Sequence, residues 1–397
     1  MKIIKKDGTV EGWDGDKIKE AVYKAADRVN QYVDPDLLNI VVEKVHACFC
    51  NGEAPTKDLH NSVIHYLKYV GLNDVANSYQ EYRDYKNTYA KSFEKVKDEA
   101  DNVLLLGDRE NANFDSSLVS TKGSLIKGYL TKELYRQFYL STVEKELTKR
   151  GDIYIHDMRD MLMGSVNCCL FDIGNVLRGG FSMSNVDYTE PTSVLSALQV
   201  IGDITLVATA QQFGGFSLSQ LDMVLLPYCH KTWNKAYKQA SNSFPEANEV
   251  QLSGYAWRTL QDELKQGFQS LELKLNTVPC SRGDFAFTTV SFGCWNDPEL
   301  THKDKLFLKA ICEALLKTRM NGHGENNKPV VFPKLVYLYD EDCVGGSIEA
   351  SDVFELAIEC SSKCLYPDFL SLSGDVKHNA VAQQYVNHNQ VVTPMGA

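Results

Sequence analysis

The first ninety or so residues show a strand-like start followed by apolar residues at helical spacing. Lys2–Ile4 and Thr9–Glu11 flank Asp7-Gly8, a dipeptide typical of two-residue turns, and together they predict a β-hairpin. Helical patterns follow, in which apolar residues recur every three or four positions; they begin near Asp14, Asp34, Pro55 and Asn73. The pattern therefore predicts a small module built from a hairpin and about four helices.

The pattern changes between Tyr85 and Asp101, where charged residues dominate and large apolar side chains are few. This composition is typical of a solvated connecting helix between two domains. We place the domain boundary near residue 92, which gives a small domain at 1–92 and a larger one at 93–397.

The larger domain mixes long helical stretches with short apolar segments. Helices are predicted over Lys132–Arg150, over Ser193–Gln212, and from about Leu218 into the 260s. Strands are predicted over Asp284–Phe292, Val330–Tyr339 and Gln390–Val392. Strands that alternate with helices indicate an α/β architecture. The nearly continuous apolar run at Phe332–Leu338 is typical of a strand that is buried on both faces.

Composition places the chain among globular proteins and limits the classes of partner that it can bind. Of the 397 residues, 44% are hydrophobic and 23% are charged, which is ordinary for a protein with a sizeable core. The formal net charge of −11 argues against duplex DNA as a partner, because DNA-binding proteins rely on a cationic surface, but it leaves nucleotides open. Without an apolar run of about 20 residues or a signal-peptide core, we expect a cytoplasmic protein with no membrane contact.

The eleven cysteines do not have the spacing of a disulfide framework or of a zinc site. Disulfide frameworks belong to short secreted domains, and this chain contains no CxxC pair and no HExxH sequence. The commonest role of a single cysteine is that of a small buried apolar side chain. We therefore expect no metal site within these residues.

The hairpin gathers candidate phosphate ligands. Lys5 and Lys6 precede the Asp7-Gly8 turn, Lys17 lies on the next helix, and Thr56 and His60 are one turn apart on a later helix. A tight turn beside lysines, facing a helix that carries another lysine, could form a cradle for a triphosphate. Because lysines beside a turn are also common on solvated surfaces, the spacing alone leaves both interpretations open.

The whole module resembles an ATP-cone, the regulatory nucleotide-binding domain that precedes many ribonucleotide reductases. Three segments carry the resemblance in the family's order: IIKKDGTVEGWDGDKI, PTKDLH and ANSYQEYRDYK. The resemblance implies that ATP or dATP binds as an allosteric ligand, together with Mg²⁺. The nucleotide contacts that it implies are Ile3, Lys5, Lys6, Glu11, Lys17, Thr56 and His60.

Residues 113–397 resemble the catalytic subunit of the anaerobic, class III ribonucleoside-triphosphate reductases. Seven blocks in family order carry this resemblance: YIHD, NCCLFDIGNVLRGGF, QQFGGFSLSQLD, NTVPCSRGDFAFTTVSFG, GENNKPVVFPKL, CSSKCLYPD and TPMGA. The resemblance implies an α/β fold in which the ATP-cone is followed by the first part of a ten-stranded α/β barrel of the glycyl-radical-enzyme type.

The resemblance also implies radical chemistry that replaces the ribose 2′-hydroxyl by hydrogen and so supplies deoxyribonucleotides for DNA synthesis. A thiyl radical abstracts the 3′-hydrogen, the 2′-hydroxyl leaves as water, and formate supplies the reducing equivalents in the best-known members. Cys168 would give a hydrogen atom to the 2′ carbon, with Cys169 as the alternative. The residues expected in the substrate pocket are His156, Asn167, Pro394, Met395 and Gly396. Structural roles for His156 and Asn167 remain equally open.

The sequence departs from the family at its end. The thiyl cysteine normally follows Pro-Met-Gly, whereas here Ala397 follows Gly396 and the chain stops. The family's zinc site of four cysteines and its radical-bearing glycine would lie further on. We therefore expect an N-terminal portion of the enzyme that cannot turn over alone. A split gene, an inserted element and an engineered fragment are all compatible with this end.

The resemblance implies partners for the complete enzyme. These are ribonucleoside-triphosphate substrates, deoxynucleotide effectors, an activating iron–sulfur protein that uses S-adenosylmethionine, the missing C-terminal half, and a second copy in a homodimer. One alternative is a non-catalytic regulator or relic that binds ATP or dATP through the cone. Another glycyl-radical enzyme with an appended cone is a weaker alternative, because those relatives do not share the seven blocks.

Overall fold

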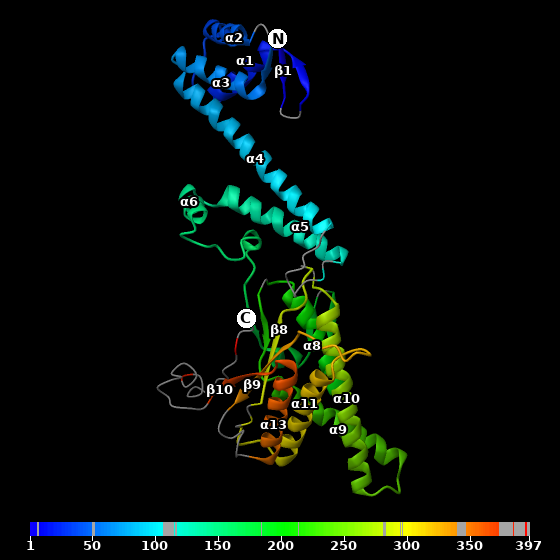
Figure 1. Cartoon of the computed structure of the whole chain (residues 1–397). Helices are drawn as coiled ribbons and strands as arrows, with labels where there is room; N and C mark the ends of the chain where they lie inside the picture. The colour runs from blue at the N-terminus through cyan, green and yellow to red at the C-terminus, as the bar shows by residue number, and fades with distance from the viewer. Residues whose placement is uncertain are drawn as a thin grey trace. The chain divides into compact units, whose positions relative to one another are not determined.

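The computed structural model of the chain forms two compact units, Met1–Asp98 and Glu99–Ala397 (Figure 1). The structure describes residues 1–5, 8–49, 52–105, 115, 117–183, 185–212, 214–280, 283–293, 295, 297–339, 347–372, 384 and 394. In this described part, no helix is both long enough and apolar enough to cross a membrane.

The first unit contains a small three-stranded sheet. Its strands are β1 (Lys2–Ile4), β2 (Val10–Gly12) and β3 (Glu53–Pro55). β1 lies in the middle, antiparallel to β2 and parallel to β3, so that Ile3 pairs with Glu11 on one side and with Ala54 on the other. The predicted hairpin is confirmed, whereas β3 was not predicted, because three residues give no usable alternation.

Four helices complete this unit and begin at the predicted positions. They are α1 (Gly15–Arg28), α2 (Pro35–Phe49), α3 (Thr56–Tyr69) and α4 (Asn73–Leu105). Their apolar faces meet in one core, in which Val22, Leu38, Val63 and Val75 are fully buried. The hydroxyl of Ser78 donates a 3.0 Å hydrogen bond to the carbonyl of Ala25 and so fixes α4 against α1.

The second unit is built around a sheet of five parallel strands. In spatial order these are β10 (Asp368–Ser371), β9 (Lys334–Tyr339), β8 (Thr288–Phe292), β7 (Phe216–Leu218) and β4 (Cys169–Phe171). Each neighbouring pair runs parallel. A separate hairpin pairs β5 (Phe181–Met183) with β6 (Val186–Tyr188). The predicted mixed α/β architecture is confirmed.

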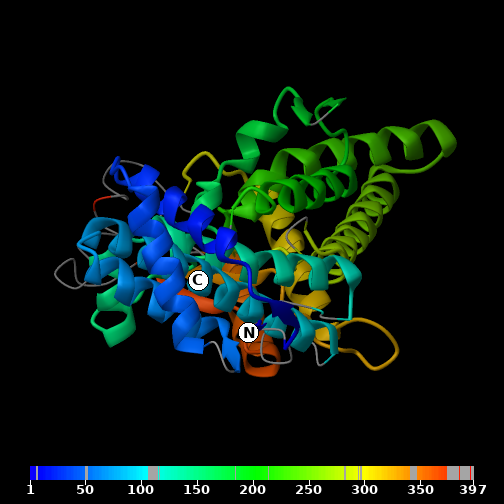
Figure 2. The same ribbon diagram turned by 90° about the horizontal axis from the view of Figure 1, so that it is seen from above.

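Helices accompany this sheet throughout the second unit. They are α5 (Val119–Leu134), a π-helix (Tyr135–Tyr139), α6 (Thr142–Arg150), a 3₁₀ turn (Met161–Met163), α7 (Ile173–Leu177), α8 (Val194–Thr209), α9 (Leu221–Ser243), α10 (Glu249–Thr277), α11 (His302–Asn321) and α13 (Ile348–Cys364). Figures 1 and 2 show α9 and α10 running side by side as a long pair.

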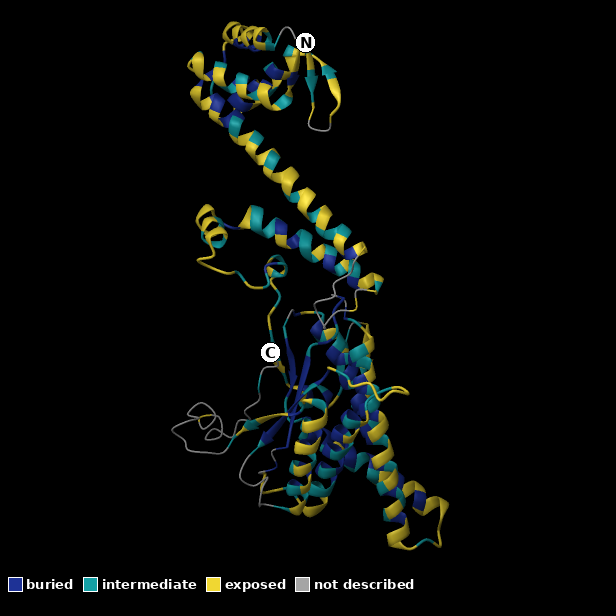
Figure 3. Ribbon diagram, in the orientation of Figure 1, coloured by how far each residue is buried: buried dark blue, intermediate teal, exposed yellow. Residues whose placement is uncertain are grey.

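The core of the second unit lies between the sheet and these helices. Phe216, Val290 and Tyr337 of successive strands are fully buried in it, as Figure 3 shows by the dark strands and inner helix faces. β9 is buried from Leu335 to Leu338, as its apolar sequence predicted.

Two predicted helices are each divided in two. The stretch Lys132–Arg150 breaks before Ser141, whose hydroxyl and Glu144 form a capping box that starts α6. The stretch after Leu218 breaks between Ser243 and Glu249, where Asn248 and Gln251 form a second capping box. The predicted strand Gln390–Val392 lies outside the described residues.

A buried ion pair joins α10 to α11. Glu272 accepts a 2.8 Å hydrogen bond from Nε of Arg319, and both side chains are fully buried. Arg319 also donates to the carbonyl of Pro333 at 2.6 Å, and His323 contacts the second oxygen of Glu272 at 2.9 Å. The pair therefore fixes two helices and the segment that leads into β9.

Replacing Glu272 with alanine should strongly destabilise the second unit, because it leaves the Arg319 guanidinium buried without its counter-charge. We expect the free energy of unfolding to fall by about 3–5 kcal/mol, measured by urea unfolding of the full chain. Glu313→Ala is the matched control, since Glu313 pairs with Lys317 at the half-buried helix surface and should cost less than about 1 kcal/mol. Equal losses in the two variants would contradict this assignment.

Candidate functional site

The predicted contact residues of the hairpin module converge on one hollow. Its volume is about 440 Å³, and it opens between the small sheet, α1, α3 and α4. Every predicted residue that the structure describes lines it: Ile3, Lys5, Glu11, Lys17, Thr56 and His60. Lys6, the remaining predicted contact, lies outside the described residues.

Glu11 holds two of the lysines at the mouth of this hollow. Its carboxylate lies 2.9 Å from Nζ of Lys5 and 3.2 Å from Nζ of Lys17. The hydrogen bonds, first from Lys5 and then from Lys17, lower the pKa of Glu11 below its usual range. Glu11 therefore stays ionised at neutral pH and keeps two cations together at the same opening.

Thr56 and His60 reach the hollow from the first two turns of α3. The hydroxyl of Thr56 donates a 2.9 Å hydrogen bond to the carbonyl of Ile4, which ties the start of α3 to the end of β1. Nδ1 of His60 lies 2.6 Å from the hydroxyl of Tyr79 on α4. Burial raises the pKa of Tyr79 to about 12, so the phenol stays neutral.

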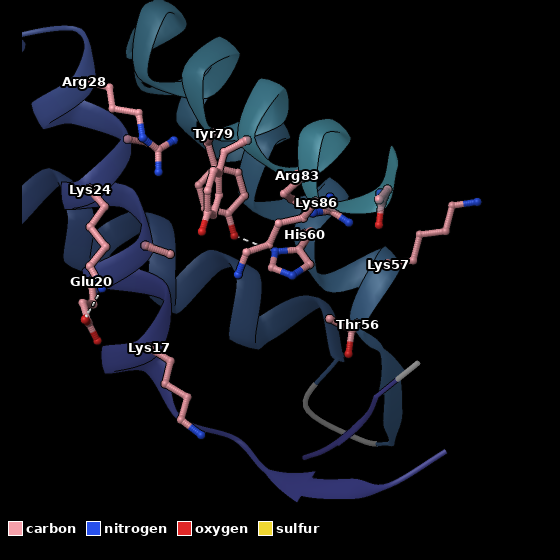
Figure 4. A pocket seen from close by; sticks show the side chains of 14 residues that line it. Lys17, Glu20, Lys24, Arg28, Thr56, Lys57, His60, Tyr79, Arg83 and Lys86 are labelled. Atoms are coloured by element: carbon pink, nitrogen blue, oxygen red, sulfur yellow. Dashed lines mark hydrogen bonds and ion pairs between the residues drawn. The ribbon is translucent and has the colours of Figure 1, made fainter. Parts of the chain in front are cut away.

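A second, more cationic hollow adjoins the first. Its volume is about 590 Å³, and the two hollows share Lys17, Ala21, Thr56, His60 and Tyr79 (Figure 4). The cations that line the second hollow are Lys17, Lys24, Arg28, Lys57, Arg83 and Lys86. Glu20 contributes a carboxylate to the lining of this hollow, 2.5 Å from Nζ of Lys24.

Sequence reasoning selected Lys17 but not the other cations of α1 and α4 that line the second hollow. Lys24, Arg28, Arg83 and Lys86 lie at helical spacing on polar faces, and that pattern looks the same on a surface that only meets water. Their convergence depends on the packing of α4 against α1, which the sequence does not display. The guanidinium of Arg28 lies 4.1 Å from the centre of the Tyr82 ring, a contact that holds it at the rim.

The two hollows together can bind a ligand with an apolar part and a polyanionic part. Ile3, Ile18 and Leu59 give the first hollow apolar surface. The second offers lysine and arginine side chains whose donors match phosphate oxygens. The amino-terminal turn of α3, with Thr56 and Lys57, adds the positive end of a helix dipole.

The second unit holds the predicted cysteine beside two glycines. Cys168 is half-buried just before β4, and its thiol lies 3.3 Å from Oδ1 of Asn167. The amide of Gly215 donates a 3.2 Å hydrogen bond to the same sulfur. The amide of Gly214 donates to the carbonyl of Asn167 at 2.6 Å. The structure therefore brings Asn167 and Cys168 together and adds the two glycines as their neighbours.

Close approach explains the glycine at position 214. A Cβ atom there would lie 2.1 Å from Oδ1 of Asn167 and 2.5 Å from Sγ of Cys168, far inside contact distance. The side-chain amide of Gln212, itself buried, bonds the carbonyls of both glycines at 3.1 and 2.7 Å. Any larger residue at 214 would therefore displace the thiol.

The remaining predicted residues of the second unit lie in different surroundings. Cys169 is in β4, where burial raises the pKa of its thiol. The carbonyl of Pro394 accepts a 3.0 Å hydrogen bond from Ser217 on the neighbouring strand β7. His156 is exposed and contacts Asp157 at 2.9 Å, and among the described residues it makes no hydrogen bond or ion pair with Cys168. Met395 and Gly396 lie outside the described residues.

Comparison with known families matches both units. Residues 110–397 match the family model described as anaerobic ribonucleoside-triphosphate reductase, and residues 1–88 match the model of the ATP cone domain.

Curated relatives align with nearly all of this chain. The anaerobic ribonucleoside-triphosphate reductase of Haemophilus influenzae is 30% identical over 386 residues, which cover 94% of this chain and 52% of that protein. The protein of the same name from Salmonella typhimurium is 29% identical over 385 residues, with the same shares. The chain therefore spans about half the length of the curated relatives it matches.

A solved structure shows weaker similarity. The crystal structure of the anaerobic ribonucleotide reductase from Thermotoga maritima in complex with dATP and CTP is 16% identical to this chain, with a TM-score of 0.47. The match covers 76% of this chain and 52% of that one.

Substituting Gly214 with alanine should disturb Cys168, because the added methyl group overlaps the thiol. We expect a loss of about 1–3 kcal/mol in the free energy of unfolding, together with faster alkylation of Cys168 by iodoacetamide, followed by mass spectrometry. Gly254→Ala is the control: it lies in α10 with open space around it and should stabilise the chain by about 0.5–1 kcal/mol. An unchanged alkylation rate in Gly214→Ala would refute the contact.

Proposed function

This chain belongs to the anaerobic ribonucleoside-triphosphate reductase family, and we propose that its first unit is the allosteric nucleotide site of such an enzyme. The observation that carries the proposal is the convergence of the predicted contact residues on one hollow, joined to a second hollow lined by six cations. A nucleoside triphosphate combines the two features that these hollows accommodate, an aromatic base and a highly charged polyphosphate.

The proposed ligand is ATP or dATP, held with its base toward the hairpin and its phosphates toward α4, instead of in the hairpin cradle that the sequence suggested. The apolar side chains of Ile3, Ile18 and Leu59 suit a base, whereas Lys17, Arg83 and Lys86 suit the phosphates. The Mg²⁺ that accompanies a nucleotide would be coordinated by phosphate oxygens and water. In this scheme ATP permits activity of the enzyme and dATP suppresses it.

The proposed role of the second unit is the reduction of ribonucleoside triphosphates to 2′-deoxyribonucleoside triphosphates. The five parallel strands would form the first part of a ten-stranded barrel around the substrate. Cys168 would give a hydrogen atom to the 2′ carbon, which requires a neutral thiol in a fixed position. The contacts of its sulfur with Asn167 and Gly215 support that role, because they restrict the position of the thiol.

The complete cytoplasmic enzyme would need further components. We propose that the remaining part of the family sequence supplies the thiyl cysteine, the zinc site and the radical-bearing glycine. An activating iron–sulfur protein that uses S-adenosylmethionine would generate the radical, and deoxynucleotide effectors at the interface of a homodimer would select the substrate.

ATP and dATP should bind the full chain, and Lys17→Ala should weaken binding of both. Loss of one phosphate contact from a charged donor is expected to cost about tenfold in Kd, measured by isothermal titration at fixed salt. Lys44→Ala is the matched control, because Lys44 is an exposed lysine on α2 that does not line either hollow. No heat of binding with either nucleotide at millimolar concentration would refute the proposed regulatory site.

Cys168→Ser should abolish deoxynucleotide formation, because a serine hydroxyl does not donate a hydrogen atom as a thiol does. The assay would combine this chain with a second polypeptide that carries the remaining half of a curated relative and with the activating protein. Cys169→Ser should keep most of the activity, and ATP affinity should stay within about twofold in both variants, because the cone is a separate unit. Loss of activity in Cys169→Ser alone would instead assign the role to Cys169.

A further inference from the structure

Tyr79 links the apolar core of the first unit to its cavity. It exposes only 4% of its surface and packs with the core residues, while its hydroxyl lies 2.6 Å from Nδ1 of His60. The two rings are tilted by 52°, with their centres 5.7 Å apart (Figure 4). Because Nδ1 is engaged by Tyr79, Nε2 is the ring nitrogen on the side away from this bond.

The Tyr79–His60 pair lines both hollows. Tyr79 and His60 are among the few residues that line the hairpin hollow and the cationic hollow alike. A ligand that extends from one hollow to the other must therefore pass the imidazole. The orientation of that ring determines whether it meets the ligand with a donor or with a carbon edge.

The charged residues that share the two hollows with His60 are mostly cations. They are Lys5, which follows β1, and Glu11 of β2; Asp14, Lys17, Glu20, Lys24 and Arg28 at the start of or within α1; Lys57 of α3; and Arg83 and Lys86 of α4. A bound polyphosphate would add negative charge beside the ring, and a nearby opposite charge favours a protonated imidazole. The contact that orients His60 must therefore suit both charge states.

A tyrosine hydroxyl can hold the ring in both charge states. It donates to Nδ1 of the neutral imidazole and accepts from the Nδ1–H of the imidazolium. Burial keeps the pKa of Tyr79 at about 12, so the hydroxyl retains its own proton throughout the physiological range. A carboxylate or a lysine in this place would favour one charge state over the other.

We propose that Tyr79 is a positioning residue for nucleotide binding, which holds the His60 imidazole with Nε2 as a donor toward the ligand whether the ring is neutral or charged. This inference rests on the proposed nucleotide function of the unit. In this proposal the hydroxyl of Tyr79 orients His60, in addition to the packing that the phenyl ring provides.

The first test uses the free protein and does not depend on nucleotide binding. In the full chain labelled with ¹⁵N-histidine, the ring resonances of His60 are identified by their loss in His60→Gln. Tyr79→Phe should move the Nδ1 resonance toward that of an unbonded imidazole, while Tyr82→Phe should leave it unchanged. Tyr82 is a matched control, because it lines the cationic hollow one turn along α4 and its hydroxyl makes no hydrogen bond within the described part of the chain. An unmoved Nδ1 resonance in Tyr79→Phe would overturn the proposal.

The second test measures ATP affinity of the full chain by isothermal titration at pH 6 and pH 8. Tyr79→Phe should weaken binding about tenfold at both pH values, because the hydroxyl engages Nδ1 in either charge state. The ratio to wild type at each pH cancels the titration of the phosphate groups. A loss confined to one pH value, or no loss at either, would overturn the proposal.

A double variant distinguishes a specific effect of Tyr79 on His60 from a general loss of packing. His60→Gln keeps the phenyl ring and hydroxyl of Tyr79 but removes the imidazole, so adding Tyr79→Phe to it should change ATP affinity by less than about twofold. A further tenfold loss in the double variant would show that Tyr79 acts independently of His60. Failure of the wild-type chain to bind ATP would refute the proposed function, and the resonance measurement would still decide whether Tyr79 positions His60.

Discussion

The contact of α4 with α1 and α3 is the constraint on which the cavity of the first unit depends. The cationic side chains of that cavity come from α1, α3, α4 and the residue after β1, which are far apart in sequence. Buried residues such as Val22, Val63 and Val75 hold the helices together beneath the cavity. Tyr79 extends this core to the cavity floor, where its hydroxyl meets His60. The apolar core therefore holds these mutually repelling cations at fixed distances from one another.

The electrostatics of the cavity follow from this arrangement. Glu11 compensates Lys5 and Lys17, and Glu20 compensates Lys24. The charges of Arg83 and Lys86 come from α4, which continues past the end of the first unit. Mutual repulsion among exposed cations is weakened by water and salt, so the unit tolerates them when empty. A polyphosphate in the cavity would convert that repulsion into attraction, which couples binding to the packing of α4.

The sequence predicted some levels of this structure better than others. The hairpin, the helix starts and the buried strand β9 followed from turn residues and apolar spacing. Two capping boxes, at Ser141–Glu144 and Asn248–Gln251, divide α5 from α6 and α9 from α10. Both are visible in the sequence, but the prediction missed them. The strands β3, β4 and β7 are three residues long, too short for a periodic signal. The family motifs predicted the hairpin contacts, whereas the role of Tyr79 depends on how α3 and α4 pack, which spacing along one helix does not reveal.

Hydrogen–deuterium exchange of the full chain with and without dATP tests the central claim most directly. The account predicts that the nucleotide slows exchange in β1, in β2, in the first two turns of α3 and around Tyr79 in α4, with the sheet of the second unit unaffected at low nucleotide concentration. Slower exchange confined to the second unit, with the hairpin and α4 unchanged, would contradict the account.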